Sequence, residues 1–288
     1  MKTPLFTGVC TALVTPFTDN KINYPMLKVI LRRQIEANVK AIVIAGTTGE
    51  APTLTDREKI DLFRISKEFV GDKCKIIAGT GTNSTEHTVA LSKTAEDVGV
   101  DALLVVAPYY NKPNNSGLLA HFQAVSDAVD TPVILYNIPS RTGIDIPVPV
   151  YEALSKTSNI VGVKEASSDI TKHSQIRAVC RPDFCIWAGN DTQIIPSASL
   201  GGSGVISVLS NILPEETVAM TDAALNGDLE VARKIEQQLL PLIELLFEDT
   251  NPIPVKEIMR YIGYDCGSCR LPLTKAASKL TKKICSII

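Results

Sequence analysis

The sequence predicts an α/β protein built as a (β/α)8 TIM barrel with a C-terminal helical extension. Eight short apolar runs recur at intervals of roughly 20–35 residues, which is the spacing expected of strand–helix units. Between these runs, apolar residues repeat with the 3.6-residue period of amphipathic helices. The chain has 288 residues, which is enough for eight such units in a single barrel.

The eight runs are apolar nearly throughout, which is typical of parallel strands that helices cover on both faces. Aromatic residues make up only 5% of the chain, so the core around these strands has to be aliphatic. As strands we predict residues 8–14, 41–45, 75–78, 102–106, 132–136, 160–163, 184–188 and 204–208.

Helix signals fill the intervening segments and continue beyond the last strand. Thr55 and Glu58 have the spacing of a capping box at the start of one helix. We predict that the barrel occupies residues 1–226 and that residues 227–288 form a helical appendage. The first helix of the appendage carries an apolar stripe made of Val231, Ile235, Leu239, Leu242 and Leu246.

The charge balance argues against two classes of partner. The chain has 29 Lys and Arg residues against 31 Asp and Glu residues, so its formal net charge is −2. Nucleic acids and membrane surfaces favour strongly basic faces, and we expect neither as a partner. No apolar run approaches the ~20 residues that a membrane-spanning helix needs. We therefore expect a soluble protein of the cytoplasm.

The cysteines and histidines do not indicate a metal site. Seven cysteines, an odd number without a secretory signal pattern, indicate reduced thiols. Cys266 and Cys269 have the spacing of a metal or redox pair, but no further ligands follow at zinc-site spacing, so we expect ordinary loop thiols. His87, His121 and His173 lie far apart in helical segments, and we expect them at the surface.

In a barrel of this kind, the chemistry takes place on the loops that follow the carboxyl ends of the strands. Polar residues would be costly inside these buried strands without a functional reason. They follow the second to seventh predicted strands, in the segments 46–50, 79–83, 108–111, 136–141, 164–165 and 189–191.

Lys164 is the most unusual of these polar residues, because lysine is depleted in strands and is rarely fully buried. Strand alternation places Lys164 on the same side as Gly162 and opposite Val163. If that side faces the barrel lumen, the amine is a candidate Schiff-base nucleophile, because uncharged amines attack ketones. An exposed lysine is only ~0.1% free amine near neutral pH, and burial raises that fraction. A strand-end lysine that reaches solvent or pairs with a carboxylate fits the pattern equally well.

Three neighbouring loops supply candidate partners. Tyr136 ends the adjacent strand and is either a proton carrier or a large side chain at the rim. Thr47 and Thr48 lie in a glycine-bounded turn whose N–H groups suit a carboxylate, although such turns also occur without a ligand. Arg141 either offers a two-pronged donor to a second carboxylate or is a solvated loop residue.

Taken in order, these motifs resemble the dihydrodipicolinate synthase family, within the superfamily that includes N-acetylneuraminate lyase. The tyrosine pair and the Ser-Arg-Thr-Gly run favour the synthases over the lyases. The motifs are Gly46-Thr47-Thr48-Gly49-Glu50, Gly79-Thr80-Gly81, Pro108-Tyr109-Tyr110-Asn111, Tyr136-Asn137-Ile138-Pro139-Ser140-Arg141-Thr142-Gly143 and Gly162-Val163-Lys164-Glu165-Ala166.

The resemblance implies a lyase that condenses pyruvate with L-aspartate 4-semialdehyde through a Schiff base, the first committed step of diaminopimelate and lysine biosynthesis. It implies no cofactor and no metal. Four residues match the catalytic positions: Lys164, which forms the imine, and a proton relay of Tyr136, Thr47 and Tyr110. Four others match substrate-binding positions: Thr48, Arg141, Gly189 and Ile206.

The resemblance also bears on assembly and regulation. In the family, Tyr110 comes from a neighbouring subunit, which implies at least a homodimer and favours a tetramer made of two dimers. Lysine-inhibited members carry a histidine and a glutamate in the helices where this chain has Lys59 and His87. Asn83 and Tyr109 match, but Lys59 and His87 suit an incoming ammonium poorly, so we expect weak or absent inhibition by lysine.

Two other functions stay open. One is another pyruvate-dependent class I aldolase or lyase, acting on N-acetylneuraminate or a keto-deoxy sugar acid. Arg141 argues against this function, because such a substrate has no second carboxylate near that loop. The other is a non-enzymatic barrel that senses a keto acid. A complete proton relay argues against a sensor, because binding alone needs no relay.

Overall fold

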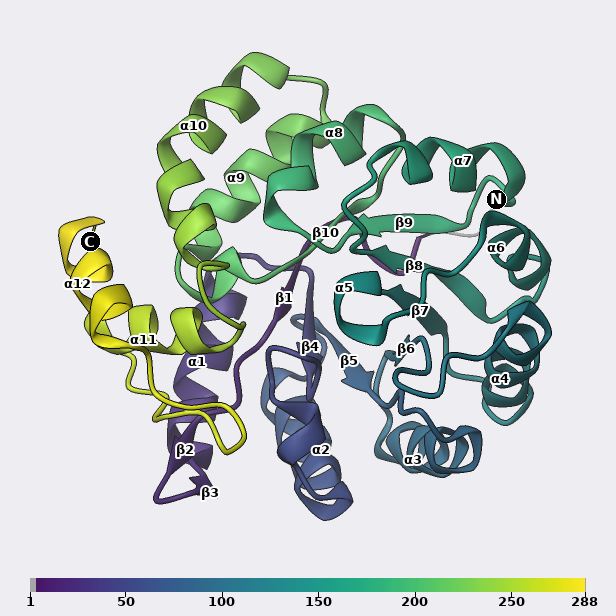
Figure 1. The fold of residues 1–288 in the computed structure, drawn as a ribbon, viewed down its shortest axis with the longest axis horizontal. Helices are drawn as coiled ribbons and strands as arrows, with labels where there is room; N and C mark the ends of the chain where they lie inside the picture. Colours follow the sequence, from purple (N-terminus) through teal and green to yellow (C-terminus); the bar gives the residue numbers. More distant parts are fainter. Residues whose placement is uncertain (1–3, 288) are drawn as a thin grey trace.

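The computed structural model describes residues 4–287, and these form a ring of strands surrounded by helices (Figure 1). All eight barrel strands are parallel and close in the order β1-β10-β9-β8-β7-β6-β5-β4. They are β1 (Gly8–Ala12), β4 (Ala41–Ile44), β5 (Lys75–Gly79), β6 (Ala102–Val106), β7 (Val133–Asn137), β8 (Ile160–Glu165), β9 (Cys185–Ala188) and β10 (Gly204–Ser207). The (β/α)8 prediction is confirmed, because every predicted strand matches a barrel strand to within two residues at each end.

Helices cover the outside of the barrel, and a small antiparallel hairpin of β2 (Phe17–Thr18) and β3 (Lys21–Ile22) follows β1. The α-helices of the barrel are α1 (Tyr24–Glu36), α2 (Asp56–Val70), α3 (Thr85–Val98), α4 (Asn115–Asp127), α5 (Pro139–Thr142), α6 (Val148–Leu154), α7 (Thr171–Val179), α8 (Ile194–Ser199) and α9 (Pro214–Leu225). Three 3₁₀ turns lie at the ends of strands or before helices: η1 (Ala51–Thr53), η2 (Asp191–Gln193) and η3 (Leu209–Asn211).

The predicted capping box begins α2. The backbone N–H of Thr55 donates to Glu58 Oε2 at 2.9 Å, and the backbone N–H of Glu58 donates to Thr55 Oγ1 at 3.2 Å. Each bond satisfies an N–H group that the helix itself leaves without a partner. The start of α2 is therefore determined locally, by four consecutive residues.

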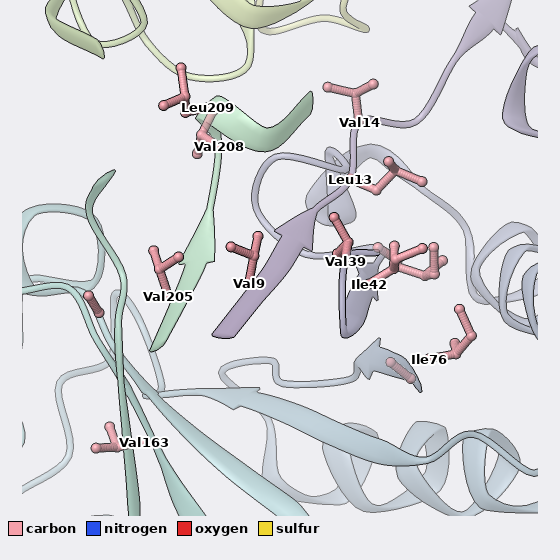
Figure 2. Close-up of a cluster of buried hydrophobic side chains, with 14 of the residues drawn as sticks. Val9, Leu13, Val14, Val39, Ile42, Ile76, Val163, Val205, Val208 and Leu209 are labelled. Carbon is pink, nitrogen blue, oxygen red and sulfur yellow. The ribbon is translucent and has the colours of Figure 1, made fainter. Parts of the chain in front are cut away.

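Strand alternation divides the core into an outer layer and a lumen. The outer layer lies between the strands and the helices, and Figure 2 shows Val9 and Val205 in it, from paired positions on β1 and β10. In the lumen, Phe6 stacks on Trp187 with the ring centroids 4.6 Å apart. Gly162 makes room for Trp187, because a Cβ atom at that position would lie 2.8 Å from the indole ring. This apolar packing fills the lumen and leaves the polar residues at the carboxyl ends of the strands.

Three further helices form the appendage: α10 (Leu229–Leu245), α11 (Ile253–Tyr261) and α12 (Ser278–Ile287). In Figure 1 the appendage lies beside α9 and α1, with α12 at the outer edge. Leu239, Leu242 and Leu246 of the predicted stripe are buried, but Val231 is 42% exposed. The stripe prediction was wrong at Val231, because the first turn of α10 is exposed to solvent on this side, as the neighbouring Leu229 also is. The division of the chain at residue 226 stays a prediction.

Two of the three histidines are buried, and the prediction of surface positions for them was wrong. His121 is 4% exposed on α4, and His173 is 1% exposed on α7. Both lie on the faces of their helices that pack against the barrel, where an uncharged imidazole can be accommodated. Burial lowers the pKa of each to about 4. The third, His87, lies at the surface as expected.

All seven cysteines are free thiols, and Cys266 and Cys269 lie in the loop between α11 and α12. Burial raises the pKa of both thiols to about 12. In the part of the chain that the structure describes, no three His, Cys, Asp or Glu side chains are grouped so that they could hold a metal ion. Within the same residues, no helix has both the length and the apolar character needed to cross a membrane.

Candidate active site

A cavity of about 580 Å³ opens at the carboxyl ends of the strands, and we call it the central cavity. Residues 247–251, between α10 and α11, form part of its wall, so the appendage contributes directly to the site. Six of the eight residues predicted for the site line this cavity: Lys164, Tyr136, Thr47, Thr48, Arg141 and Gly189.

Lys164 points into the lumen from the carboxyl end of β8. It is 4% exposed, and its Nζ lies 4.5 Å from the centre of the Tyr136 ring. The two residues are register partners on β8 and β7, so the strand pairing itself sets their separation. Among residues 4–287, no carboxylate lies within 4.0 Å of this amine. The amine therefore faces the cavity without an ion-pair partner.

Glu165 lies on the opposite face of β8 and anchors the end of that strand. Its fully buried carboxylate accepts hydrogen bonds from the Tyr151 hydroxyl at 3.0 Å, Asn137 Nδ2 at 2.9 Å and the Ser167 N–H at 2.8 Å. Its backbone carbonyl accepts a bond from the N–H of Gly189 at 2.7 Å. These four bonds hold the strand end from which the neighbouring Lys164 projects.

The loop that carries Thr47 and Thr48 is held by a buried ion pair. Glu50, at its end, has a φ of 58°, and its side chain is fully buried. Lys256 of α11 reaches Glu50 Oε1 at 2.7 Å with a side chain only 3% exposed. A buried pair of this kind is costly to break, because one charge would then be left without a partner. The appendage thus holds the threonine loop in place.

Arg141 and Gly189 shape the opposite side of the cavity. Arg141 lies on the short helix α5 and donates from Nη2 to the backbone carbonyl of Asn251 at 2.9 Å. Gly189 follows β9, where a Cβ atom would lie 2.4 Å from the Cβ of Ala166. Only glycine fits this close approach, which keeps the cavity open beside Lys164.

Two predicted residues do not line the central cavity. Ile206 is fully buried in the lumen, on β10. Tyr110 is 89% exposed and lies outside the cavity, with a φ of 73° that tyrosine rarely adopts. Conversely, Asn251 lines the cavity and was not predicted. The only signal in the sequence was its place before a proline, which also fits an ordinary helix start.

Two buried groups lie within the electrostatic influence of Lys164. Burial raises the pKa of the Cys10 thiol, and the Lys164 charge acts in the opposite direction. Burial likewise raises the pKa of Asp191, against hydrogen bonds from Ser207 and from the N–H groups of Leu209 and Val208. The base of the site is therefore buried, and its ionisable groups respond to the Lys164 charge.

A second cavity, of about 540 Å³, adjoins the first, and we call it the side cavity. Thr47, Tyr136 and Arg141 line both cavities. Its other walls carry the four residues considered above for regulation and also Asp56; those four are Asn83, Tyr109, Lys59 and His87. Asp56 lies between two of these groups, 3.6 Å from Lys59 Nζ and 2.8 Å from His87 Nε2.

Residues 5–288 match the model of the dihydrodipicolinate synthetase family over nearly the whole chain. The chain belongs to this family. The resemblance seen in the motifs is thus confirmed.

Relatives in the dihydrodipicolinate synthetase family match this chain over nearly their full length. The 4-hydroxy-tetrahydrodipicolinate synthase of Acetivibrio thermocellus is 44% identical over 97% of this chain and 95% of its own. The synthase from Cyanidioschyzon merolae, solved with lysine bound, has a TM-score of 0.96 at 39% identity, covering 99% of this chain and 98% of that chain. The chloride-inhibited synthase from Acinetobacter baumannii, complexed with pyruvate, has a TM-score of 0.96 at 35% identity, covering 98% and 97%.

Proposed function

We propose that this protein is a 4-hydroxy-tetrahydrodipicolinate synthase, a lyase that condenses pyruvate with L-aspartate 4-semialdehyde. The observation that carries the proposal is the buried Lys164 amine, which faces a cavity against the ring of Tyr136 and has no ion-pair partner among the described residues. Membership of the family and the curated name of a relative 44% identical support the same reaction. The pyruvate complex of a similar structure supports the first substrate.

In the proposed reaction, Lys164 Nζ attacks the ketone carbon of pyruvate, and the carbonyl oxygen leaves as water to give an imine. The Thr47–Thr48 backbone and the Thr48 hydroxyl hold the pyruvate carboxylate, Gly189 lines the space around it, and Ile206 packs in the lumen. The methyl group then loses a proton. The cationic imine accepts the electron pair, and an enamine forms.

The enamine carbon attacks the aldehyde of aspartate 4-semialdehyde, whose oxygen takes a proton to become a hydroxyl. The substrate's amine next adds to the imine carbon, closes the ring and expels the Lys164 amine. Tyr136, Thr47 and Tyr110 carry the protons in this proposal, and Arg141 binds the carboxylate of the aldehyde substrate. No step calls for a cofactor or a metal ion.

We propose that the active form is at least a homodimer and most favourably a tetramer of two dimers. The support is Tyr110, whose exposed side chain lies outside its own cavity on a strained backbone. In a dimer, this tyrosine would enter the active site of the second copy and complete the proposed proton relay there. A variant that sediments as a clean monomer should lose activity, and full activity in such a monomer would overturn the dimer proposal.

The reduced state of all seven cysteines supports action in the cytoplasm, where thiols stay reduced. The partners in this proposal are the two small-molecule substrates and further copies of the chain, not nucleic acid or membrane.

Borohydride reduction in the presence of pyruvate, followed by peptide mass mapping, tests the chemistry. We expect a pyruvyl adduct on Lys164 in the natural enzyme and none in Lys164→Arg, which keeps a charge but cannot form the imine. A panel of aldehydes with pyruvate then tests the second substrate. The absence of an adduct on Lys164 would exclude the proposed reaction. Turnover of sugar aldehydes in preference to aspartate 4-semialdehyde would instead assign the protein to the sugar-acid aldolases.

A further inference from the structure

Asn251 connects the two sides of the central cavity. It is 93% buried, since only 7% of it is exposed, and it lies in the wall contributed by the appendage. Its side chain donates from Nδ2 to Thr48 Oγ1 at 2.9 Å. Its backbone carbonyl accepts the bond from Arg141 already described. The residue therefore touches both of the groups to which carboxylate binding is assigned.

The direction of the bond to Thr48 has a chemical consequence. A hydroxyl has one proton to donate and two lone pairs that accept. Because Asn251 Nδ2 donates to Thr48 Oγ1, the bond occupies a lone pair and leaves the hydroxyl proton free. Within residues 4–287, Asn251 is the only hydrogen-bond partner of this hydroxyl. The proton is thus available to an acceptor in the cavity.

The threonine loop has little freedom to reorient by other means. Glu50 forms its buried ion pair with Lys256, which follows Asn251 on the same segment, in the first turn of α11. The carbonyl of Gly49 accepts a bond from Thr15 Oγ1 at 2.7 Å. With the backbone held on both sides, the rotation of the Thr48 hydroxyl is set by the side chain of Asn251.

We infer that Asn251 is a positioning residue, which turns the Thr48 hydroxyl proton toward the carboxylate of the keto acid. The inference rests on the proposed function, because that function places the keto-acid carboxylate at Thr48. It extends the site to a residue of the appendage that touches no reacting atom.

Asn251→Asp tests the inference with almost no change of shape. The carboxylate would accept the Thr48 proton, turn it away from the cavity and repel an incoming carboxylate. We expect the pyruvate concentration that gives half-maximal borohydride labelling of Lys164 to rise about 30-fold or more. Asn251→Ala removes only the orienting bond and should raise that concentration about 5-fold. The alanine variant also answers the question if the aspartate variant does not fold.

Asn190→Asp is the matched control for charge. Asn190 lines the same cavity, but its Nδ2 donates to Ser167 and Gln193 and not to Thr48. We expect this variant to raise the half-saturating pyruvate concentration less than about 5-fold, because it adds the charge without reversing the Thr48 bond. An equal rise in the two aspartate variants would mean that charge alone acts, and the inference would fail.

A double-mutant cycle with Thr48→Val separates positioning from a general structural effect. Once the hydroxyl is gone, Asn251→Ala should cause no further loss in pyruvate binding. Additive losses in the double variant would overturn the inference. If the natural enzyme gives no adduct at all, the proposed function fails instead. An adduct that saturates equally in the natural enzyme and in Asn251→Asp rejects the role of Asn251 alone.

Discussion

Tyr136 and Lys164 occupy paired positions on β7 and β8, and both side chains face the lumen. Tyr136→Phe keeps the ring against the Lys164 amine but removes the hydroxyl that the proposed mechanism uses as a proton carrier. We expect kcat at saturating substrates to fall about 10²- to 10³-fold. Labelling of Lys164 by pyruvate and borohydride should still go to completion, because the amine itself remains.

The two measurements together separate proton transfer from binding. A change in kcat of less than about 3-fold would show that another group carries the proton. Loss of labelling would show that the hydroxyl is needed to form the imine, and not only for the later steps. Thr47→Val is the matched variant, since it removes the second hydroxyl of the proposed relay and leaves Tyr136 in place.

At the scale of elements, Arg270 ties the loop after α11 to the start of α2. Its guanidinium contacts both carboxylate oxygens of Glu58, at 2.6 and 2.9 Å, and lies 4.3 Å from the centre of the Phe17 ring. The hydrogen bond from Arg270 lowers the pKa of Glu58 to about 2. We expect Arg270→Ala to lower the free energy of unfolding by about 2 kcal/mol at pH 7, measured by urea denaturation.

The pH dependence of this loss follows from the direction of the shift. A lowered pKa contributes stability that is present above the unfolded value of about 4.5 and disappears as the pH falls toward 2. The difference between the natural protein and Arg270→Ala should therefore shrink over that range. Arg64→Ala is the control, because Arg64 makes an exposed pair with Asp61 on the same helix and should leave the free energy of unfolding nearly unchanged. A constant difference at every pH would contradict the assignment to Glu58.

The side cavity brings α2 and α3 together around Asp56. Its carboxylate, the acidic group of that wall, already contacts Lys59 and His87. An incoming lysine would meet the Lys59 ammonium and find no free carboxylate there. We expect weak or absent inhibition by lysine in a steady-state assay, with any inhibition constant weaker than millimolar. A millimolar inhibition constant or tighter would refute this expectation.

At the scale of the whole molecule, the two buried histidines make the fold sensitive to acid. Each stays neutral in the folded state down to about pH 4, but is protonated in the unfolded chain below about pH 6.5. The unfolded chain therefore binds more protons, and stability falls as the pH drops from 6.5 to 4. We expect each histidine to remove about 3 kcal/mol at pH 4 relative to pH 7.

His173→Leu tests this sensitivity, because neither ring nitrogen of His173 has a hydrogen-bond partner among the described residues. At pH 7 the free energy of unfolding of the variant should be close to that of the natural protein. At pH 4 the variant should be the more stable of the two. If the free energy of unfolding of His173→Leu falls between pH 6.5 and pH 4 as steeply as that of the natural protein, His173 is not the source of the acid sensitivity.

Much of the architecture was predictable because its causes are local. The eight strands and the start of α2 follow from patterns in consecutive residues, and the alternation along β8 placed Lys164 on the same side as Gly162. The prediction of a buried stripe on α10 was wrong at Val231, and the prediction of surface positions was wrong for His121 and His173. In each case, the outcome depended on whether another element covers that face of the helix.

By itself, the sequence determined the barrel and the family, and it singled out the strand-end residues of the proposed site, since strand and helix periods are properties of neighbouring residues. Only the tertiary structure decided how the site is held. Asn251 meets Thr48 across 203 positions of sequence, and Lys256 meets Glu50 across 206. Contacts over such separations exist only after the barrel has closed and the appendage has packed on it, and no short-range pattern encodes them.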